Sequence, residues 1–150
     1  MLLTDYIGEE DIICGFSAAG KAEALEKLCR FAAGRHGLPL EEILKVVRDR
    51  EDLGSTGLGG GVALPHGKSA CLERPVLVLA AAPEGVDFDS LDGRPVRVFV
   101  LMLTPSGGGG EHLQLLARLG ALFKSPEAVE ELLAASDPAG IRAFLARRES

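Results

Sequence analysis

The sequence predicts an α/β protein, folded as a single domain in which helices pack on both faces of a β-sheet. Two runs, PVLVLAAA at 75–82 and PVRVFVLMLT at 95–104, are apolar almost throughout. Such continuous apolar runs are typical of strands that are covered on both faces. Segments with apolar residues at helical spacing lie before and after these runs, so helices are available for both sides of the sheet. A length of 150 residues fits one domain of this kind.

The first third of the chain predicts one strand and two helices. The apolar run at 11–16 is expected to be a strand, followed by Ser17 as the N-cap of a helix that Gly34 ends. Pro39 predicts the start of a second helix, which runs to about Arg50. Apolar residues at helical spacing give each of these helices a side that can face the core: Ala22, Leu25, Leu28 and Ala32 in the first, and Leu40, Ile43 and Val47 in the second.

The second half of the chain predicts three more helices. A turn-rich connection at 84–94 joins the two apolar strands, and a helical stripe of leucines covers 111–123. Pro126 and Pro138 lie where two further helices are expected to start, and Asp137 is the expected N-cap of the second.

Composition excludes several classes of protein. The net charge of −6 disfavours nucleic-acid binding, which needs a basic face to bind phosphates. The three cysteines form no C-x-x-C pair, a pattern that suits free thiols in a reducing compartment. No basic, apolar leader opens the sequence, and no apolar run is long enough to span a bilayer. We therefore expect a cytoplasmic protein with no direct membrane insertion.

The stretch STGLGGGVALPHGKS at 55–69 invites comparison with a nucleotide-binding loop. A Walker A loop ending at Gly-Lys-Ser 67–69 would need its first glycine at the position of Val62, and Gly61 misses this by one residue. A dinucleotide fingerprint fails at the same Val62, which occupies the place of its last glycine. Pro65 also removes a backbone donor from the loop. Both nucleotide interpretations are therefore disfavoured.

His66 at the end of this stretch is open to two interpretations. It can be an exposed side chain after a tight glycine turn, or it can handle a phosphoryl group. The second is favoured because His112 also follows a glycine-rich loop and opens a helix, while Arg50 offers a fixed charge suited to phosphate. Ser55 and Thr56 add hydroxyls nearby in the sequence. Zinc is disfavoured because the two histidines lack further ligands at suitable spacing, so no metal is expected.

Three segments of the chain carry a resemblance to a known family. REDLGSTGLGGGVALPHG at 50–67 resembles the phosphorylation-site signature of the enzyme IIA proteins of the bacterial phosphoenolpyruvate:sugar phosphotransferase system, in the mannitol/fructose/nitrogen-regulatory class. The segment at 85–105 resembles the central strand region of that family, and 111–123 resembles its second-histidine helix. Together they cover nearly the whole chain in the family's order. The resemblance implies a mixed β-sheet sandwiched between helices on both faces, with residues 1–150 forming one IIA domain.

The resemblance also implies a phosphotransferase component that works through a phosphohistidine. It implies that His66 accepts a phosphoryl group from HPr or from its nitrogen-branch counterpart, and that His112 hydrogen-bonds this group and orients His66. Arg50 would stabilise the phosphoryl oxygens. Cofactors are not expected, because a phosphohistidine donor makes a metal or a nucleotide unnecessary.

Three further residues are implied as phosphoryl-binding positions. Ser55 and Thr56 would line the site, and Gly59, as one of the glycines, would let the backbone come close to the phosphorylated ring. Leu58 and Leu64 are candidates for an apolar docking surface around His66, although Leu64 fits the core equally well.

Two functions agree with the resemblance. A regulator of the nitrogen branch would bind target proteins according to its phosphorylation state. A fructose- or mannitol-type IIA would instead pass the group to a IIB domain during sugar uptake. The sequence contains no fused HPr, IIB or membrane domain, which favours the regulator. The expected partners are thus an HPr-type phosphocarrier protein and either a regulatory target or a IIB domain.

Overall fold

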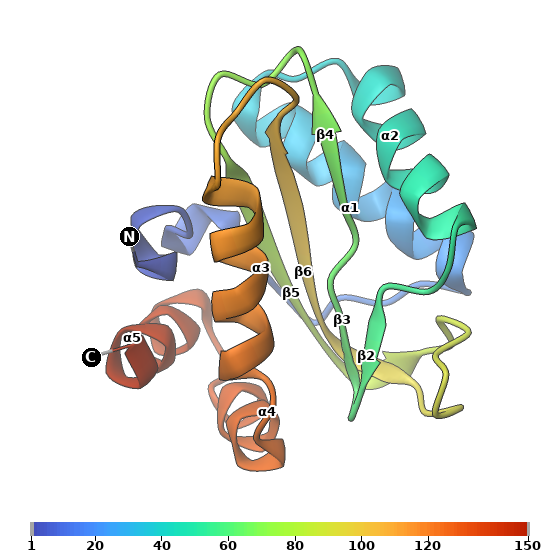
Figure 1. Cartoon of the computed structure of the whole chain (residues 1–150). Coiled ribbons are helices and arrows are strands. Elements are labelled where there is room, and N and C mark those ends of the chain that lie inside the picture. Colours follow the sequence, from blue (N-terminus) through green and yellow to red (C-terminus); the bar gives the residue numbers. More distant parts are fainter. Residues whose placement is uncertain (1, 150) are drawn as a thin grey trace.

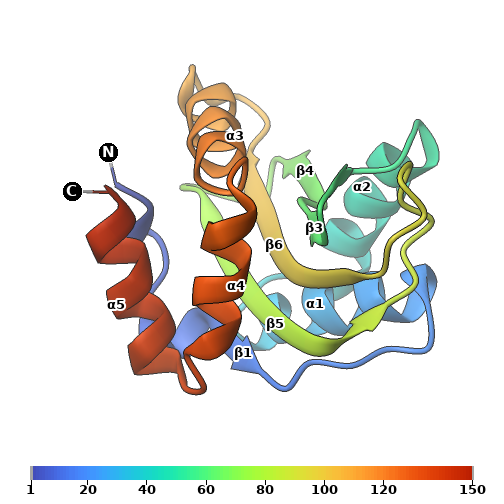
Figure 2. The same cartoon turned by 90° about the horizontal axis from the view of Figure 1, so that it is seen from below.

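The computed structural model describes residues 2–149 and confirms the α/β fold with a mixed sheet between two layers of helices. The sheet is six-stranded and has the order β1-β5-β6-β3-β2, with β4 also paired to β6. Figure 2 shows the sheet curving between the two helical layers. The strands are β1 Ile12–Cys14, β2 Gly57–Gly59, β3 Val62–Ala63, β4 His66–Ser69, β5 Val76–Val86 and β6 Val96–Pro105.

The long strand β6 organises the sheet. It pairs antiparallel with β5 on one side and parallel with both β3 and β4 on the other. β3 lies opposite the start of β6, and β4 lies opposite its end, where His66 pairs with Met102 and Lys68 pairs with Thr104. The chain thus leaves the sheet briefly between β3 and β4, and His66 is the first residue after it returns.

Five α-helices cover the two faces of the sheet. Figure 1 shows α1 and α2 on one face and α3, α4 and α5 on the other. Two single-turn 3-10 helices, Leu3–Asp5 and Glu9–Asp11, precede β1. The α-helices are α1 Lys21–His36, α2 Leu40–Asp52, α3 Glu111–Leu122, α4 Pro126–Ala134 and α5 Pro138–Glu149.

The two apolar strands supply both halves of the core. Alternate residues of β5 point to opposite faces, so Val78 packs in the cluster under α1 and α2, whereas Leu79 packs in the cluster under α3, α4 and α5. Phe99 and Val100 divide in the same way on β6. All four side chains are fully buried. Coverage on both faces explains why these strands show no polar alternation.

The predicted limits of the first helix are wrong at both ends. Ser17 is not its N-cap: α1 begins at Lys21, after Gly20, and no side chain caps its first turn. Gly34 does not end the helix either, because its own backbone stays helical and α1 continues to His36. The helix ends at Gly37, whose φ of 67° is the left-handed conformation that glycine adopts without a Cβ clash.

Predictions in the second half of the chain hold more closely. Pro126 and Pro138 begin α4 and α5, and Asp137 accepts a hydrogen bond of 2.7 Å from the Gly140 amide as the predicted cap. β5 runs beyond 82 to Val86, with an irregular register after Ala81. Within residues 2–149, none of the helices combines the length and the apolar character needed to cross a membrane.

Candidate functional site

The fold brings His66 and His112 together beside the end of β6. His66 begins β4, and His112 lies in the first turn of α3, directly after the loop that leaves β6. Their ring centroids are 5.4 Å apart, with an angle of 64° between the planes. Two imidazoles in edge contact at a strand start and a helix start form the centre of the candidate site.

The hydrogen bond of His66 determines which of its nitrogens is nucleophilic. Nδ1 lies 2.8 Å from the carbonyl oxygen of Leu64, and a carbonyl can only accept, so Nδ1 carries the proton. Nε2 therefore keeps its lone pair. Burial lowers the pKa of His66, although the Leu64 bond opposes this effect, and the positive charge of Arg50 lowers it further. The ring is neutral at neutral pH, as a nucleophile requires.

His112 is held in a drier environment than His66. Its side chain is buried, and its Nδ1 lies 2.6 Å from Oγ1 of Thr104, which is 2% exposed. Burial lowers the pKa of His112 to about 4, helped by the nearby His66 and by the charge of Lys68. His112 is therefore a neutral hydrogen-bonding partner at neutral pH.

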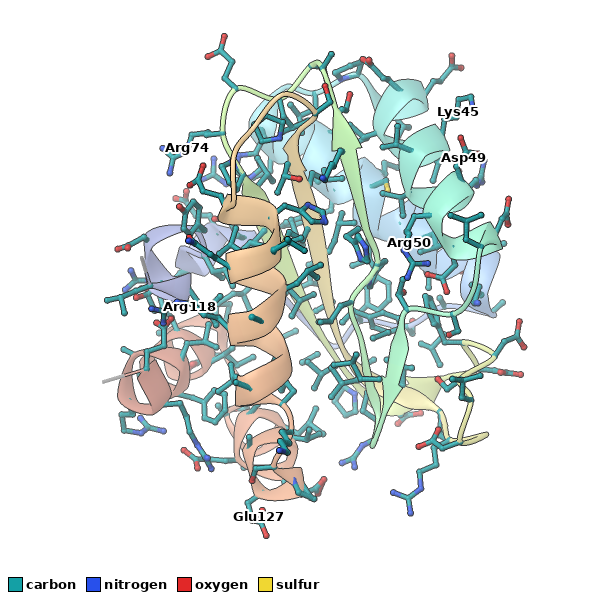
Figure 3. All side chains as sticks on the ribbon, in the orientation of Figure 1. Lys45, Asp49, Arg50, Arg74, Arg118 and Glu127 are labelled. Atoms are coloured by element: carbon teal, nitrogen blue, oxygen red, sulfur yellow. The ribbon has the colours of Figure 1, made fainter. Side chains whose placement is uncertain are left out.

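Arg50 lies at the last turn of α2. Figure 3 shows its side chain projecting toward the strands, whereas Lys45 and Asp49 lie on the outer side of the helix. Its Nη1 donates a 3.0 Å hydrogen bond to the Gly54 carbonyl. In the described part of the chain no carboxylate forms an ion pair with Arg50, so its charge is available for an anion near His66.

The distance between α2 and β4 depends on one glycine. A Cβ at Gly67 would lie 2.8 Å from Cγ2 of Val46 and 3.2 Å from that residue's backbone carbon. Only glycine lets the strand approach the helix this closely. The contact brings the helix that carries Arg50 against the strand that carries His66.

The three predicted phosphoryl-binding positions have other contacts in the structure. Thr56 is buried, and both its amide and its hydroxyl donate to the carboxylate of Glu51. Ser55 accepts a 3.1 Å hydrogen bond from the Gly57 amide. Gly59 ends β2, where a Cβ would lie 3.2 Å from the Asp92 carboxylate. Phosphoryl binding by these residues stays a prediction.

Lys68 is a site residue that sequence reasoning missed. It follows His66 by two positions on β4, so both side chains leave the same face of the strand. Its positive charge lowers the pKa of both His66 and His112. In the sequence, Lys68 belongs to Gly-Lys-Ser 67–69, which was considered only as part of an incomplete nucleotide-binding motif. Strand spacing, rather than that motif, would have placed the lysine beside the histidines.

Glu51 was missed as well. Its side chain is 3% exposed and accepts hydrogen bonds from the Thr56 amide and hydroxyl, while its Oε2 forms a 2.9 Å ion pair with Lys21. It follows Arg50 directly, so it fixes the turn through which the chain passes from α2 to β2. An acidic residue inside the helical pattern was its only signal in the sequence.

The two leucines considered for an apolar docking surface lie in different surroundings. Leu58 is 52% exposed on β2, whereas Leu64 is 4% exposed and belongs to the core under α3. Leu113, directly after His112, is 72% exposed. Leu113 is therefore the exposed leucine next to His112 in the sequence, whereas Leu58 lines a pocket with Gly120 and Phe123 at the other end of α3.

The low pKa of His112 predicts a loss of stability in acid. In the fold this pKa falls from the ordinary value of 6.5 to about 4, so the unfolded chain binds more protons between these values. The stabilisation is complete above pH 6.5 and is lost as the pH falls toward the folded-state value. Urea unfolding across this range should show a falling free energy of unfolding, with a shallower slope for His112→Gln. An unchanged slope in that variant would contradict the assignment.

Comparisons with known proteins agree with this fold. A nitrogen regulatory protein of Bradyrhizobium diazoefficiens is 36% identical over 146 residues, covering 97% of this chain and 95% of that protein. A fructose-specific EIIA component of Haloferax volcanii is 33% identical over 69% of this chain and 67% of its own length. The crystal structure of the nitrogen regulatory protein IIA-Ntr from Neisseria meningitidis superposes with a TM-score of 0.89 at 30% identity, covering 95% of this chain and 98% of that one.

A family model also matches the chain. Residues 5–148 match the model described as the phosphoenolpyruvate-dependent sugar phosphotransferase system, EIIA 2, which is nearly the whole chain. The mannitol IIA structure from Escherichia coli, at 25% identity, has a TM-score of 0.77 over 93% of this chain and 98% of that one. The chain therefore belongs to the EIIA type-2 family and is a phosphocarrier component of the phosphotransferase system.

Proposed function

We propose that this phosphocarrier accepts its phosphoryl group on Nε2 of His66, from an HPr-type phosphocarrier protein, and acts as a nitrogen-regulatory IIA. The hydrogen bond from His66 Nδ1 to the Leu64 carbonyl carries the proposal. It leaves Nε2 deprotonated, and the lowered pKa keeps the ring neutral. An exposed histidine in a surface turn would have neither the carbonyl bond nor the companion ring 5.4 Å away.

The residues of the site can supply the nucleophile, the positive charge and the hydrogen-bond donor that the transfer step requires. The Nε2 lone pair of His66 attacks phosphorus, a new N–P bond forms, and the N–P bond of the donor breaks with its electron pair returning to the donor imidazole. Such transfers depend on positioning and on stabilising the charge of the phosphoryl oxygens. Arg50 and Lys68 supply positive charge from two sides, and His112 supplies a hydrogen-bond donor. Ser55, Thr56 and Gly59 are the further positions proposed to line the site.

The regulatory role has more support than the transport role. The nitrogen regulatory relative matches 97% of this chain at 36% identity, whereas the fructose-specific relative matches 69% at 33%. A second nitrogen regulatory protein, from Pseudomonas aeruginosa, is 37% identical over 57% of the chain. The alternative is a fructose- or mannitol-type subunit that passes the group to a IIB domain. It stays a candidate because the fructose-specific relative has almost the same identity where it aligns.

One transfer experiment separates the two functions. The protein is phosphorylated with phosphoenolpyruvate, enzyme I and HPr, and is then mixed with fructose- and mannitol-type IIB domains. A regulator should retain the acid-labile group, and its unphosphorylated and phosphorylated forms should differ in which cell proteins they bind. Rapid transfer to a IIB domain would instead establish the transport role. Absence of any labelling would contradict the phosphocarrier chemistry on this chain.

A further inference from the structure

A buried hydroxyl interrupts the apolar end of β6. Thr104 is 2% exposed and follows Leu101, Met102 and Leu103, which are fully buried. Its Oγ1 lies 2.6 Å from Nδ1 of His112, across the loop that joins β6 to α3. A threonine in such surroundings needs a hydrogen-bond partner, because water cannot reach the hydroxyl.

The direction of this hydrogen bond follows from counting donors and acceptors. Within residues 2–149, Oγ1 of Thr104 has no hydrogen-bond partner besides His112 Nδ1. If Nδ1–H donated to Oγ1, the hydroxyl hydrogen would be buried without an acceptor, which is costly. If the hydroxyl donates to Nδ1, both groups are satisfied, and the ring proton lies on Nε2.

We infer that Thr104 is a positioning residue that holds His112 in its Nε2–H tautomer, so that this N–H is available to a phosphoryl oxygen on His66. The inference rests on the proposed function for its consequence in transfer, but the tautomer itself does not depend on phosphorylation. With the opposite tautomer, Nε2 would present a lone pair to the negative phosphoryl oxygens and repel them.

The location of Thr104 suits it to this task. His112 follows the glycine-rich segment 106–110, and no side chain caps the start of α3 at Gly110. β6 is the central strand, and Thr104 is paired there with Lys68 of β4. The hydrogen bond therefore fixes a ring on a weakly capped helix start to the most rigidly paired strand. A 2.8 Å bond from the Tyr6 hydroxyl to Glu111 provides a second tether for the same turn.

Nitrogen NMR of the imidazole rings tests the tautomer in the unphosphorylated protein. At neutral pH, the parent should show His112 with a protonated Nε2 and an unprotonated, hydrogen-bonded Nδ1. Thr104→Val keeps the shape but removes the hydroxyl and should give a tautomer mixture or the reverse form, whereas Thr104→Ser should restore the parent pattern. Thr4→Val is the matched control, because Thr4 donates its hydroxyl to Glu149 far from the site. A parent protein with its proton on Nδ1 overturns the inference without any variant.

Transfer kinetics test the consequence. Loss of a charge-assisted hydrogen bond to the phosphoryl group predicts that Thr104→Val slows uptake from phosphorylated HPr roughly tenfold to a hundredfold. Thr104→Ser should recover most of the rate. If the parent takes up the group and Thr104→Val matches it, the inference is wrong and the proposed function stands. If the parent takes up no group, the proposed function fails, while the NMR result still decides the tautomer.

Discussion

Replacing His66 with alanine is expected to abolish phosphorylation of the chain. The variant loses the imidazole whose Nε2 is unprotonated and which lies beside His112 and near the charge of Arg50. Incubation with phosphoenolpyruvate, enzyme I and HPr should give one acid-labile phosphoryl group on the parent and background labelling on the variant. Mass spectrometry at neutral pH, together with radiolabelling, measures the difference.

Two further histidine variants serve as controls for this experiment. His36 lies 2.8 Å from Asp11 in a separate ion pair, so His36→Gln should be labelled like the parent. His112→Ala should still become labelled, although more slowly than the parent, and should pass the group on slowly, because a hydrogen bond to the phosphoryl oxygens is lost. Full labelling of His66→Ala would show that another residue is the acceptor. Unimpaired transfer by His112→Ala would remove that residue from the mechanism.

Replacing Glu51 with alanine is expected to cost about 3–5 kcal/mol of unfolding free energy, the range for breaking a buried charge pair. The substitution leaves the Thr56 amide and hydroxyl without their acceptor and Lys21 without its ion pair. Urea unfolding at neutral pH measures this loss. Since Glu51 fixes the turn after Arg50, phosphoryl uptake should also slow in the fraction that remains folded.

Glu41 provides the matched control for Glu51. It lies on the same helix α2 but is exposed, so Glu41→Ala should change the unfolding free energy by less than about 0.5 kcal/mol. Glu51→Gln retains an acceptor for Thr56 but loses the charge, and its stability should fall between the two. Equal stability of the Glu51→Ala and Glu41→Ala variants would mean that the buried carboxylate does not hold this turn.

The sequence predicts the layers of the fold well, because they depend on local patterns. The runs at 75–82 and 95–104 and the proline-started helices appear where their patterns place them. The predicted start of α1 was wrong. Ser17 is a residue type that commonly caps helices, but the helix begins only after Gly20. The preference of a residue type for the N-cap position does not locate the start of a helix when the backbone at that residue is not followed directly by helical residues.

For the candidate site, the sequence suggests individual residues but not how they are arranged. The sequence nominates His66, His112 and Arg50 as single residues, but it carries no sign of the distances between them or of which ring nitrogens are protonated. The bond from Thr104 to His112 depends on how the loop at 106–110 returns to the sheet, and no periodicity encodes that path. The role of Lys68 required knowing that 66–69 is a strand, which the surrounding glycines concealed.

If His66 is phosphorylated as proposed, the close approach at Gly67 bears on how long the phosphoryl group persists. On one side of His66, Gly67 packs so closely against Val46 that no Cβ would fit, which holds the helix that carries Arg50 near this strand. On the other side, the start of α3 follows a run of glycines and is held by the bond between Thr104 and His112 and by the bond from Tyr6 to Glu111. Under the proposed function, the lifetime of the phosphohistidine therefore depends on two neighbours that are held differently, the Arg50 helix by direct packing and the His112 ring by hydrogen bonds. Substitutions intended to alter this lifetime without disturbing the fold are therefore best placed in α3 or in the loop before it.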